Sequence, residues 1–411
     1  MSIQLIQESL SGAKIRVVGV GGGGSNIINS MLNKGIDGVE FIAVNTDSQA
    51  LDNSEADVKI QIGRNLTKGL GTGMNDEIGH KAAEESRDVI ERALAGSDMV
   101  FITAGMGGGT GTGASPEVAH LARSSGALVV AIVTKPFNFE GKQRIALAES
   151  GIERLRNEVD SLIIVPNQKI LELVSKDTTK NQAFDLANKV LYNATKGISQ
   201  IITKPGEINV DFADVRTIML DSGVAMIGTG IAEGENRAET AALDALANPM
   251  LDDLDITGSK RVLVNISSNG NITMDEINTI NTIIKEKTGD EAKYILGIVN
   301  DNEMKEEIMV TVIATEFKAC VAEYSSSDNT MSNSYKINGM TGRITEIPDD
   351  KGLAALDTPG WKRRKIEDLL NKNLSEDKIP QRVEKKDDIF GGLHIDESDY
   401  TKPAFLRKQM D

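Results

Sequence analysis

The sequence contains a single cysteine, Cys320, so an internal disulfide framework is excluded and a reducing compartment is expected. Histidine is nearly as scarce, and the three histidines, His80, His120 and His394, lie far apart in the chain. With so few imidazole and thiolate ligands, we predict no transition-metal site. Residues 1–14 lack the apolar core of a signal peptide, and no apolar run is long enough to span a bilayer. We therefore expect a cytoplasmic protein that does not insert into a membrane.

Positively charged residues are fewer than negatively charged ones. The 45 lysine and arginine residues face 61 aspartate and glutamate residues, which gives a formal net charge of -16. A chain this acidic is a poor general binder of nucleic acid or anionic membrane, so neither is expected as a partner. What the sequence does offer is 411 residues, of which 40% are hydrophobic. That length and composition suit two soluble domains and a tail.

The most informative stretch is the glycine-rich segment 107–113, Gly-Gly-Gly-Thr-Gly-Thr-Gly. It follows an apolar run, Met99–Thr103, that is typical of a buried strand, and it precedes Ser115 and Pro116, which predict a helix N-cap and first turn. A strand, a glycine loop and a helix N-terminus together favour anion binding, because backbone amides converge there and the helix end carries partial positive charge. The two threonines add hydroxyl donors or a magnesium contact. We therefore predict a phosphate-binding loop.

A second unit of this kind lies near the N-terminus. Residues 15–20 form an apolar run, 21–26 are Gly-Gly-Gly-Gly-Ser-Asn, and apolar residues follow at helical spacing. Gly19, Gly21 and Gly24 also satisfy the dinucleotide pattern G-x-G-x-x-G, and Asp47 ends the next predicted strand, where such folds place a ribose-binding acid. A nicotinamide-dependent oxidoreductase with a Rossmann-type fold is therefore the alternative function. Against it, that pattern needs one glycine loop and this chain has two.

Two further segments follow predicted strands or turns. The third glycine-rich segment, 69–73, is either another ligand-binding loop or only a turn. Helical periodicity follows it over 76–94. After a predicted strand at 127–133, Glu140 and Arg144 lie four residues apart near a helix start. The pair is either a surface ion pair or a contact to the sugar or phosphates of a ligand, and the spacing leaves both open.

Strands alternate with helices throughout the first half, with another strand expected at 161–165. This alternation predicts an α/β fold with a doubly wound parallel sheet, in which ligands bind at the carboxyl ends of the strands. Each of these loops follows the carboxyl end of a strand, so we expect them to meet in one crevice.

A long helix is predicted over 181–203, with a wide apolar stripe that favours burial between two domains. Phe184 and Asn188 lie one turn apart on it, so they either stack on and read a base or belong to the core. Beyond the helix, Asp211 is expected to cap a new helix with Asp214 in its first turn. A smaller α+β domain follows, with strands at 225–229, 261–266, 294–299 and 308–314 and helices at 236–247 and 273–287.

The spacing between these groups has a functional consequence. About fifteen helical residues separate Asn188 from the Asp211 loop, which is roughly 20–25 Å at 1.5 Å per residue. If Phe184 and Asn188 touch a base, Asp211 and Asp214 are too far away to reach the terminal phosphate of that nucleotide. We therefore hypothesise that they act on the nucleotide of another subunit, in a head-to-tail contact of the kind that builds filaments.

Together these residues resemble the tubulin superfamily, and within it the FtsZ family of bacterial cell-division GTPases. The resemblance rests on 107–113, 21–26, 134–141 with Arg144, and 209–216, and it extends from about residue 14 to residue 317. Residues 403–407 also resemble the family's tail peptide. The resemblance implies a GTPase that binds GTP or GDP with Mg²⁺, polymerises head to tail and forms the cytokinetic ring at midcell.

The resemblance also implies a role for each matched residue. Asn45 and the loop Gly71, Thr72 and Gly73 would lie near the γ-phosphate, and Glu140 and Arg144 near the ribose. Phe184 and Asn188 would hold guanine, while Asn209, Asp211 and Asp214 would complete the site of the neighbouring subunit. Membrane-tethering division proteins would dock on Pro403, Phe405, Leu406 and Arg407. The residues implied to hold the phosphates are Gly22, Gly23, Gly24, Ser25, Asn26, Gly107, Gly108, Gly109, Thr110, Gly111 and Thr112.

These inferences divide the chain into parts with different expected roles. We expect a nucleotide-binding domain at 1–180, the central helix at 181–203, a C-terminal assembly domain at 204–318, a flexible linker at 319–399 and a partner-docking tail at 400–411. Thr72, Glu316 and Lys402 depart from the family's usual alanine, glycine and apolar residue. A filament scaffold that binds GTP without turnover is a third possibility, which the two aspartates argue against.

Overall fold

The computed structural model describes residues 12–174, 177–204, 206–208, 210–247, 257–289, 291–301 and 304–316. It also describes two short paired strands, β12 (Lys336–Ile337) and β13 (Ile344–Thr345), which belong to a separate compact unit. Apart from these two strands, the predicted linker at 319–399 lies outside the described residues, as does the whole tail at 400–411.

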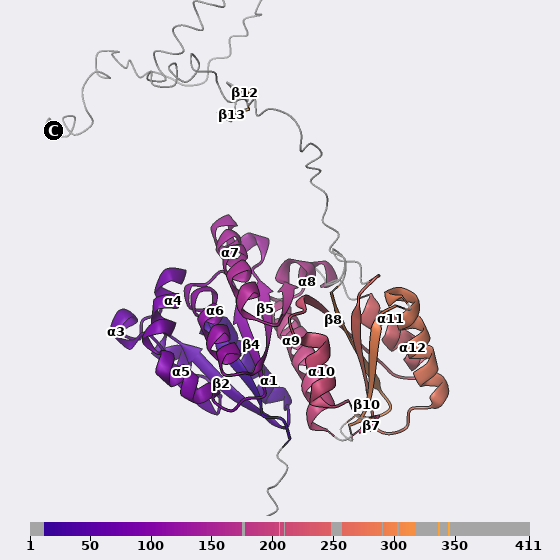
Figure 1. Ribbon diagram of the computed structural model, residues 1–411. Helices are drawn as coiled ribbons and strands as arrows, with labels where there is room; N and C mark the ends of the chain where they lie inside the picture. The colour runs from indigo at the N-terminus through magenta and orange to yellow at the C-terminus, as the bar shows by residue number, and fades with distance from the viewer. Residues whose placement is uncertain are drawn as a thin grey trace, which may run out of the picture. The chain divides into compact units, whose positions relative to one another are not determined.

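Eleven strands of the first unit form one continuous sheet in the order β3-β2-β1-β4-β5-β6-β8-β11-β9-β10-β7 (Figure 1). The first six in this order are parallel throughout, which confirms the predicted doubly wound arrangement. These strands are β1 (Ile15–Val20), β2 (Val39–Asn45), β3 (Val58–Gln61), β4 (Met99–Gly105), β5 (Leu128–Lys135) and β6 (Ser161–Pro166).

The other five strands form a mixed half of the same sheet. β8 joins the two halves by pairing in parallel with β6 over three residues, while β11 runs antiparallel between β8 and β9. β10 is parallel to β9, and β7, which the sequence analysis did not predict, is antiparallel to β10. The strands are β7 (Gly206–Ile208), β8 (Gly223–Ala232), β9 (Arg261–Ser268), β10 (Lys293–Asn300) and β11 (Ile308–Thr315).

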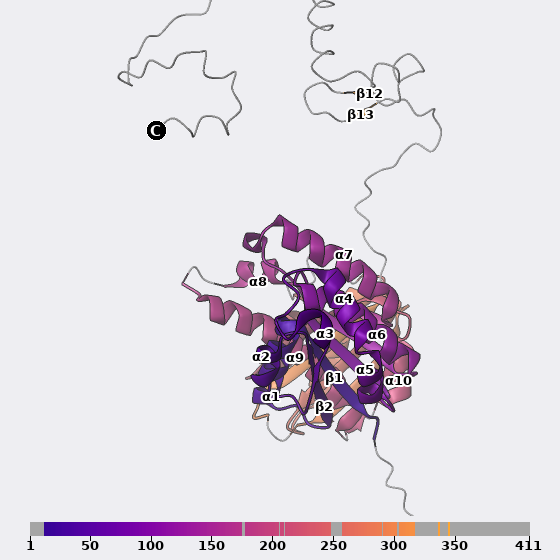
Figure 2. The same ribbon diagram turned by 90° about the vertical axis from the view of Figure 1, so that its left-hand side faces the viewer.

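Helices cover both faces of the parallel half. Alternate residues of β1 show this: Ile15 and Val17 belong to a core shared with α1 and α9, whereas Val18 and Val20 belong to a core beneath α4, α5, α6 and α7. Figure 2 shows α4, α5 and α6 packed together over the sheet. The helices are α1 (Gly21–Lys34), α2 (Ser48–Asp52), α3 (Arg64–Thr67), α4 (Asp76–Glu85), α5 (Arg87–Leu94), α6 (Gly109–Ser124), α7 (Lys142–Glu158) and α8 (Asn167–Leu173), with a 3-10 turn, η1 (Asn138–Glu140).

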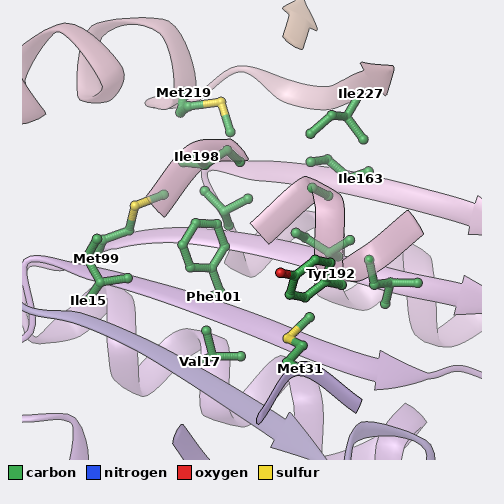
Figure 3. Close-up of a cluster of buried hydrophobic side chains, with 14 of the residues drawn as sticks. Ile15, Val17, Met31, Met99, Phe101, Ile163, Tyr192, Ile198, Met219 and Ile227 are labelled. Atoms are coloured by element: carbon green, nitrogen blue, oxygen red, sulfur yellow. The ribbon is translucent and has the colours of Figure 1, made fainter. Parts of the chain in front are cut away.

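The central helix α9 (Lys180–Thr203) lies between the two halves, as its apolar stripe predicted (Figure 1). It contacts α1 and β6 in the parallel half and β8, β9 and β10 in the mixed half. Figure 3 shows Tyr192 and Ile198 of this helix among side chains of β1, β4 and β6. The Tyr192 hydroxyl donates to the backbone oxygens of Lys34 and Gly35, at 3.3 and 3.2 Å, and so fixes α9 to the end of α1.

The mixed half has its own core, where α11 (Arg237–Leu246) and α12 (Met274–Thr288) pack on β9, β10 and β11. Helix α10 (Phe212–Met219) packs against the core shared with α9. Throughout the described ranges, no helix combines the length and apolarity that a membrane span requires. Two predicted boundaries were wrong. The periodic stretch 76–94 is divided at Ser86 into α4 and α5, and α6 starts at Gly109, so that Ser115 and Pro116 lie inside the helix.

Candidate functional site

A cavity of about 600 Å³ lies at the carboxyl ends of the parallel strands. Its walls include Val20 at the end of β1, Gly105 at the end of β4 and Thr134 near the end of β5. The expected crevice therefore exists, and it brings together predicted residues from five separate sequence segments. Twelve of the predicted binding residues line it: Gly22, Gly23, Asn26, Thr72, Gly108, Gly109, Thr110, Gly111, Glu140, Arg144, Phe184 and Asn188.

Two helix N-termini form the floor of the cavity. Helix α1 begins at Gly21 and α6 begins at Gly109, with Gly108 as its N-cap, so the glycine-rich segments are first helical turns and not separate loops. A Cβ on Gly21 would lie 2.8 Å from the amide nitrogen of Gly111, which means that the two backbones are in contact. The free amides of both first turns and the two helix dipoles favour an anion there.

Several threonine hydroxyls lie at or near the start of α6. The Oγ1 atoms of Thr46 and Thr110 are 2.7 Å apart, and the Oγ1 of Thr72 lies 3.5 Å from that of Thr110. The Oγ1 of Thr112 accepts a hydrogen bond of 2.8 Å from the amide of Gly107, which braces the start of the segment. Of these four hydroxyls, those of Thr72 and Thr110 belong to residues that line the cavity.

Glu140 and Arg144 form an ion pair of 3.1 Å on the cavity wall. The other carboxylate oxygen of Glu140 accepts from the amide of Phe137 at 2.9 Å. The Nε of Arg144 is buried and has no hydrogen-bond partner in the described protein, as is true of the buried Oδ1 of Asn167, which also lines the cavity. Buried polar atoms are normally paired, so both atoms indicate that this cavity accommodates a polar ligand.

Aromatic side chains form another part of the cavity wall. Phe184 and Asn188 of α9 both line the cavity, and the Phe184 ring meets Phe137 edge to face at 5.3 Å. Phe139 stacks on Phe137 at 4.9 Å and is 71% exposed. Phe184 thus packs against a neighbour and faces the cavity at the same time, so the two interpretations of this residue are compatible.

The other predicted binding residues are not part of the cavity lining. Gly24 is needed for packing, because its Cβ would lie 2.6 Å from the carbonyl carbon of Gly19. The Ser25 hydroxyl donates to the Gly21 oxygen at 3.1 Å, inside α1. Gly107 has a φ of 95°, and Gly71 and Gly73 have φ values of 81° and 60°, conformations that favour glycine. Asn45 is buried at the end of β2, and its Nδ2 has no hydrogen-bond partner in the described protein.

The sequence analysis missed several lining residues. Asn167 directly follows β6 and is buried, and Thr134 lies one residue before the end of β5. The rule that ligands bind at the carboxyl ends of parallel strands, applied to every strand, finds both of them. Lys180 and Phe139 also line the cavity, the former at the start of α9 with its Nζ 5.8 Å from the Phe184 ring centre. No motif marks Lys180, and Phe139 lies within the matched segment 134–141 without having been assigned a role.

The predicted acidic residues lie elsewhere. Asp211 is the N-cap of α10, and its carboxylate accepts from the amide of Asp214 at 2.8 Å, as expected. Both side chains are exposed, and neither lines the cavity. In the described part of the chain, neither carboxylate forms an ion pair. Asn209 lies outside the described residues.

Asp47 does not have the role that the dinucleotide pattern would give it. Its carboxylate accepts from the amides of Gln49 and Ala50, at 2.9 and 3.2 Å, and so caps α2. Asp47 is absent from the cavity lining. An N-cap is a sufficient reason for an aspartate at a strand end before a helix, so this residue gives no support to the oxidoreductase alternative.

Comparisons with known proteins agree with this geometry. Residues 14–175 match the GTPase domain of the Tubulin/FtsZ family, and residues 223–318 match the C-terminal domain of the FtsZ family. The cell division protein FtsZ of Buchnera aphidicola subsp. Acyrthosiphon pisum is 53% identical over 308 residues, which cover 75% of this chain and 80% of that protein. The FtsZ of Wigglesworthia glossinidia brevipalpis is 43% identical over 411 residues, covering 98% of this chain and 99% of that protein.

A solved structure gives the same result. The empty FtsZ dimer of M. jannaschii has a TM-score of 0.70 and 44% sequence identity, and the match covers 74% of this chain and 88% of that one. The matched families account for both halves of the sheet and for the glycine-rich helix ends that line the cavity. The chain therefore belongs to the FtsZ family of the tubulin superfamily and is a tubulin-like cell-division GTPase.

Proposed function

We propose that this GTPase turns over its nucleotide only after another copy of the chain docks on it, and that Asp211 and Asp214 of the docked copy complete the site. The observation that carries the proposal is the placement of these aspartates. They follow the C-terminal end of α9, whereas Phe184 and Asn188 line the cavity near its N-terminal end. From Asn188 to Thr203 the helix rises by about 22 Å, at 1.5 Å per residue.

The chemistry supports a shared site. Phosphoryl transfer needs positioning and charge neutralisation more than covalent chemistry, and the amides of the first turns of α1 and α6 would neutralise the phosphates. The sequence has no Walker lysine, so these amides would carry more of that charge. Among the described residues that line the cavity, the one carboxylate, that of Glu140, is held by Arg144 and Phe137, so none of them offers a free carboxylate to orient water.

The two aspartates would contribute differently. Asp211 is committed to capping α10, whereas no hydrogen bond from the described residues reaches the carboxylate of Asp214. We therefore assign the orientation of the attacking water chiefly to Asp214, with Asp211 holding the start of the helix in place. Asn209, outside the described residues, joins them only through the resemblance.

The nucleotide would lie with its base against Phe184 and Asn188, its ribose near Glu140 and Arg144, and its phosphates on the ends of α1 and α6. Mg²⁺ would enter with the phosphates, which are its usual main ligands. The hydroxyl oxygens of Thr72 and Thr110 on the lining are of the chemistry that magnesium accepts, so the site fits this ion. Asn45, Gly71 and Gly73 would shape the end of the site nearest the γ-phosphate.

A head-to-tail contact between a cavity and an acidic helix start is heterologous, so repetition without closure produces a filament. The relatives' name, cell division protein, supports a place in the cytoplasm at the midcell division ring. Docking of membrane-tethering division proteins on Pro403, Phe405, Leu406 and Arg407 remains an expectation, and these residues lie outside those described.

The test is GTP hydrolysis per subunit measured over a wide range of protein concentrations, with sedimentation to follow the oligomeric state. We expect a concentration threshold, below which monomers bind GTP but release almost no phosphate. A rate per subunit that stays constant on dilution to monomer would show that one chain contains the whole site.

A further inference from the structure

Helix α10 is eight residues long, and its C-terminal end is held by side chains from other elements. The last carbonyl oxygens of a helix have no partners within the helix itself. Here the Nη1 of Arg261 donates to the backbone oxygens of Thr217 and Leu220, at 2.8 and 3.3 Å. The hydroxyl of Thr315 donates to the backbone oxygen of Ile218 at 3.3 Å. Both donors belong to the mixed half of the sheet, because Arg261 begins β9 and Thr315 ends β11.

Backbone amides satisfy the two other carbonyl oxygens at this end, those of Arg216 and Met219, at 2.8 and 3.4 Å. Every carbonyl oxygen from Arg216 to Leu220 therefore has a donor, and Arg261 alone serves two of them. The positive charge of its guanidinium also suits the negative end of the helix dipole. Without this side chain, two carbonyls would be left to water and the helix end would lose its tie to β9.

The guanidinium of Arg261 is itself held in place. Its Nη2 pairs with the carboxylate of Glu316 at 2.6 Å, while its Nη1 makes both bonds to α10. The bonds to the helix therefore do not pass through Glu316. A planar guanidinium with its donors in a fixed fork can hold several acceptors in one geometry.

The held end of the helix lies close to Asp214. Thr217 follows Asp214 by three residues, so the two lie on one face of α10, about one turn apart. The whole helix is about 12 Å long at 1.5 Å per residue. A helix this short moves as one body, so a tilt at the end that Arg261 holds also displaces the first turn, where Asp214 lies.

We propose that Arg261 is a positioning residue for GTP hydrolysis, which anchors α10 and thereby sets the direction in which Asp214 meets the cavity of the docked copy. The inference rests on the role proposed above for Asp214. Arg261 does not line the cavity of its own chain, so it acts through the backbone of α10. Its loss lowers the turnover of the nucleotide in the neighbouring subunit and leaves the affinity of its own chain for GTP unchanged.

The experiment compares Arg261→Ala with Lys260→Ala in the full chain. Lys260 provides the matched control, because it pairs with the same carboxylate of Glu316, at 3.7 Å, and its side chain makes no hydrogen bond or ion pair to the described residues of α10. We expect Arg261→Ala to lower the maximal rate of hydrolysis about tenfold, since a displaced reacting group is costly, and to bind GTP as wild type does. Lys260→Ala should match wild type in both measurements.

Arg261→Lys is a second variant, in case alanine disturbs folding. It keeps the positive charge but not the planar fork, so its rate should lie between those of wild type and Arg261→Ala. A wild-type rate in Arg261→Ala and Arg261→Lys, an equal loss of rate in Lys260→Ala, or a loss of GTP affinity in either Arg261 variant would overturn the inference.

Mixtures of variants separate positioning from a general structural effect. Gly109→Ala disturbs the cavity floor, because its Cβ would lie 2.0 Å from the Oγ1 of Thr72, but it leaves the aspartates intact. These aspartates can serve the intact cavities of Arg261→Ala subunits, so phosphate release from this mixture should exceed the sum of the separate rates. Arg261→Ala mixed with Asp214→Ala should stay at the sum, since neither variant presents a well-placed Asp214.

A rise with Asp214→Ala, or none with Gly109→Ala, would overturn the inference. The proposed function has a separate test in the mixture of Asp214→Ala with Gly109→Ala, which does not involve Arg261. If that mixture exceeded the sum of its separate rates while Arg261→Ala failed as described, the inference alone would be wrong. If that mixture also stayed at the sum, the shared site itself would be wrong.

Discussion

The polar groups at the cavity of the parallel half and those at the start of α10 differ in kind and in burial. In the parallel half, many of the polar groups that face the cavity are backbone amides of glycines and buried side chains such as those of Thr72, Thr110 and Asn167. At the start of α10, which follows α9 and β7, Asp211 and Asp214 are exposed side chains on a capped helix. We infer that a surface of amides can hold an anion within one subunit, whereas exposed carboxylates with no ion pair to a described residue gain a role only when another surface covers them.

This contrast predicts where a substitution acts. Changes in the parallel half should weaken nucleotide binding, and changes at the start of α10 should leave binding intact and stop turnover. Acidic residues elsewhere in the mixed half, by contrast, should affect stability alone. The following predictions test the contrast in order of decreasing expected effect.

Asp214→Ala should lower the rate of GTP hydrolysis by about 10²–10⁴-fold, the usual contribution of a positioned acid or base, while GTP affinity stays at the wild-type value. Turnover and equilibrium binding are measured on the same preparations. Asp244→Ala is the matched control, because Asp244 is an exposed acid of α11 in the same half. Loss of GTP binding in Asp214→Ala would place this residue in the binding surface and break the contrast.

Gly109→Ala should weaken GTP binding about tenfold or more, because overpacking costs roughly 1–3 kcal/mol. Its Cβ would lie 2.0 Å from the Oγ1 of Thr72 and 2.8 Å from the amide nitrogen of Asn75, so the loop must move. Isothermal titration with GTP measures the change. Ser124→Ala, an exposed residue at the other end of α6, should bind normally. Unchanged affinity in Gly109→Ala would show that this helix end does not hold the phosphates.

Glu276→Gln should reduce the free energy of unfolding by about 1–3 kcal/mol without changing turnover per folded subunit. The side chain of Glu276 pairs with the nearly buried Arg237 at 2.7 Å, and this hydrogen bond, more than those from Thr273, holds the pKa of Glu276 below its usual value. Urea unfolding gives the size of the effect. A fall in turnover that stability does not explain would link this ion pair to the site.

The same ion pair predicts a pH dependence. A carboxylate with a lowered pKa in the folded state contributes stability above the pKa of the unfolded chain, and that contribution declines as the pH falls through the lower, folded value. The difference in stability between wild type and Glu276→Gln should therefore be constant near neutral pH and shrink below about pH 4. A difference that persists unchanged in acid would assign the effect to packing.

Glu316→Gly should have the smallest effect, a gain in stability of up to about 1 kcal/mol. Glu316 has a φ of 53°, a conformation that costs a non-glycine residue about 1 kcal/mol or more. Its ion pairs, with Arg261 at 2.6 Å and with Lys260 at 3.7 Å, are partly exposed to solvent, which weakens them. Glu316→Ala loses the ion pair and keeps the strained φ, so it should be less stable than wild type. If both variants lost stability equally in thermal melts, the ion pair would outweigh the strain.

Much of this contrast could be predicted from the sequence. The apolar runs, the glycine segments and the capping aspartate are local patterns, and each was found where it was expected. The start of α6 was missed because glycine and threonine have low helix propensity, while Ser115 and Pro116 resemble an N-terminus. Packing overrides that preference. A Cβ on Gly113 would lie 2.0 Å from the Asp76 oxygen, so these glycines allow α4 and α6 to approach closely within helical structure.

Long-range features were less predictable. The parallel pairing of β6 with β8 joins strands that are separated in sequence by α8, α9, β7 and α10. No local sequence pattern predicts such a pairing. Phe139 lines the cavity from the turn η1 and stacks on Phe137. The ion pair of Glu140 and Arg144 was left open between a structural and a ligand-binding role, and the geometry supports both, since the Nε of Arg144 has no partner among the described residues.

The central claim, that two subunits share one hydrolytic site, is tested most directly by mixing two defective variants. Asp214→Ala has an intact cavity, and Gly109→Ala has intact aspartates, so each alone should hydrolyse GTP slowly. In a mixture, Gly109→Ala subunits can dock their aspartates on the cavities of Asp214→Ala subunits, and we predict that phosphate release rises well above the sum of the two separate rates. A mixture that releases phosphate only at that sum would contradict the account.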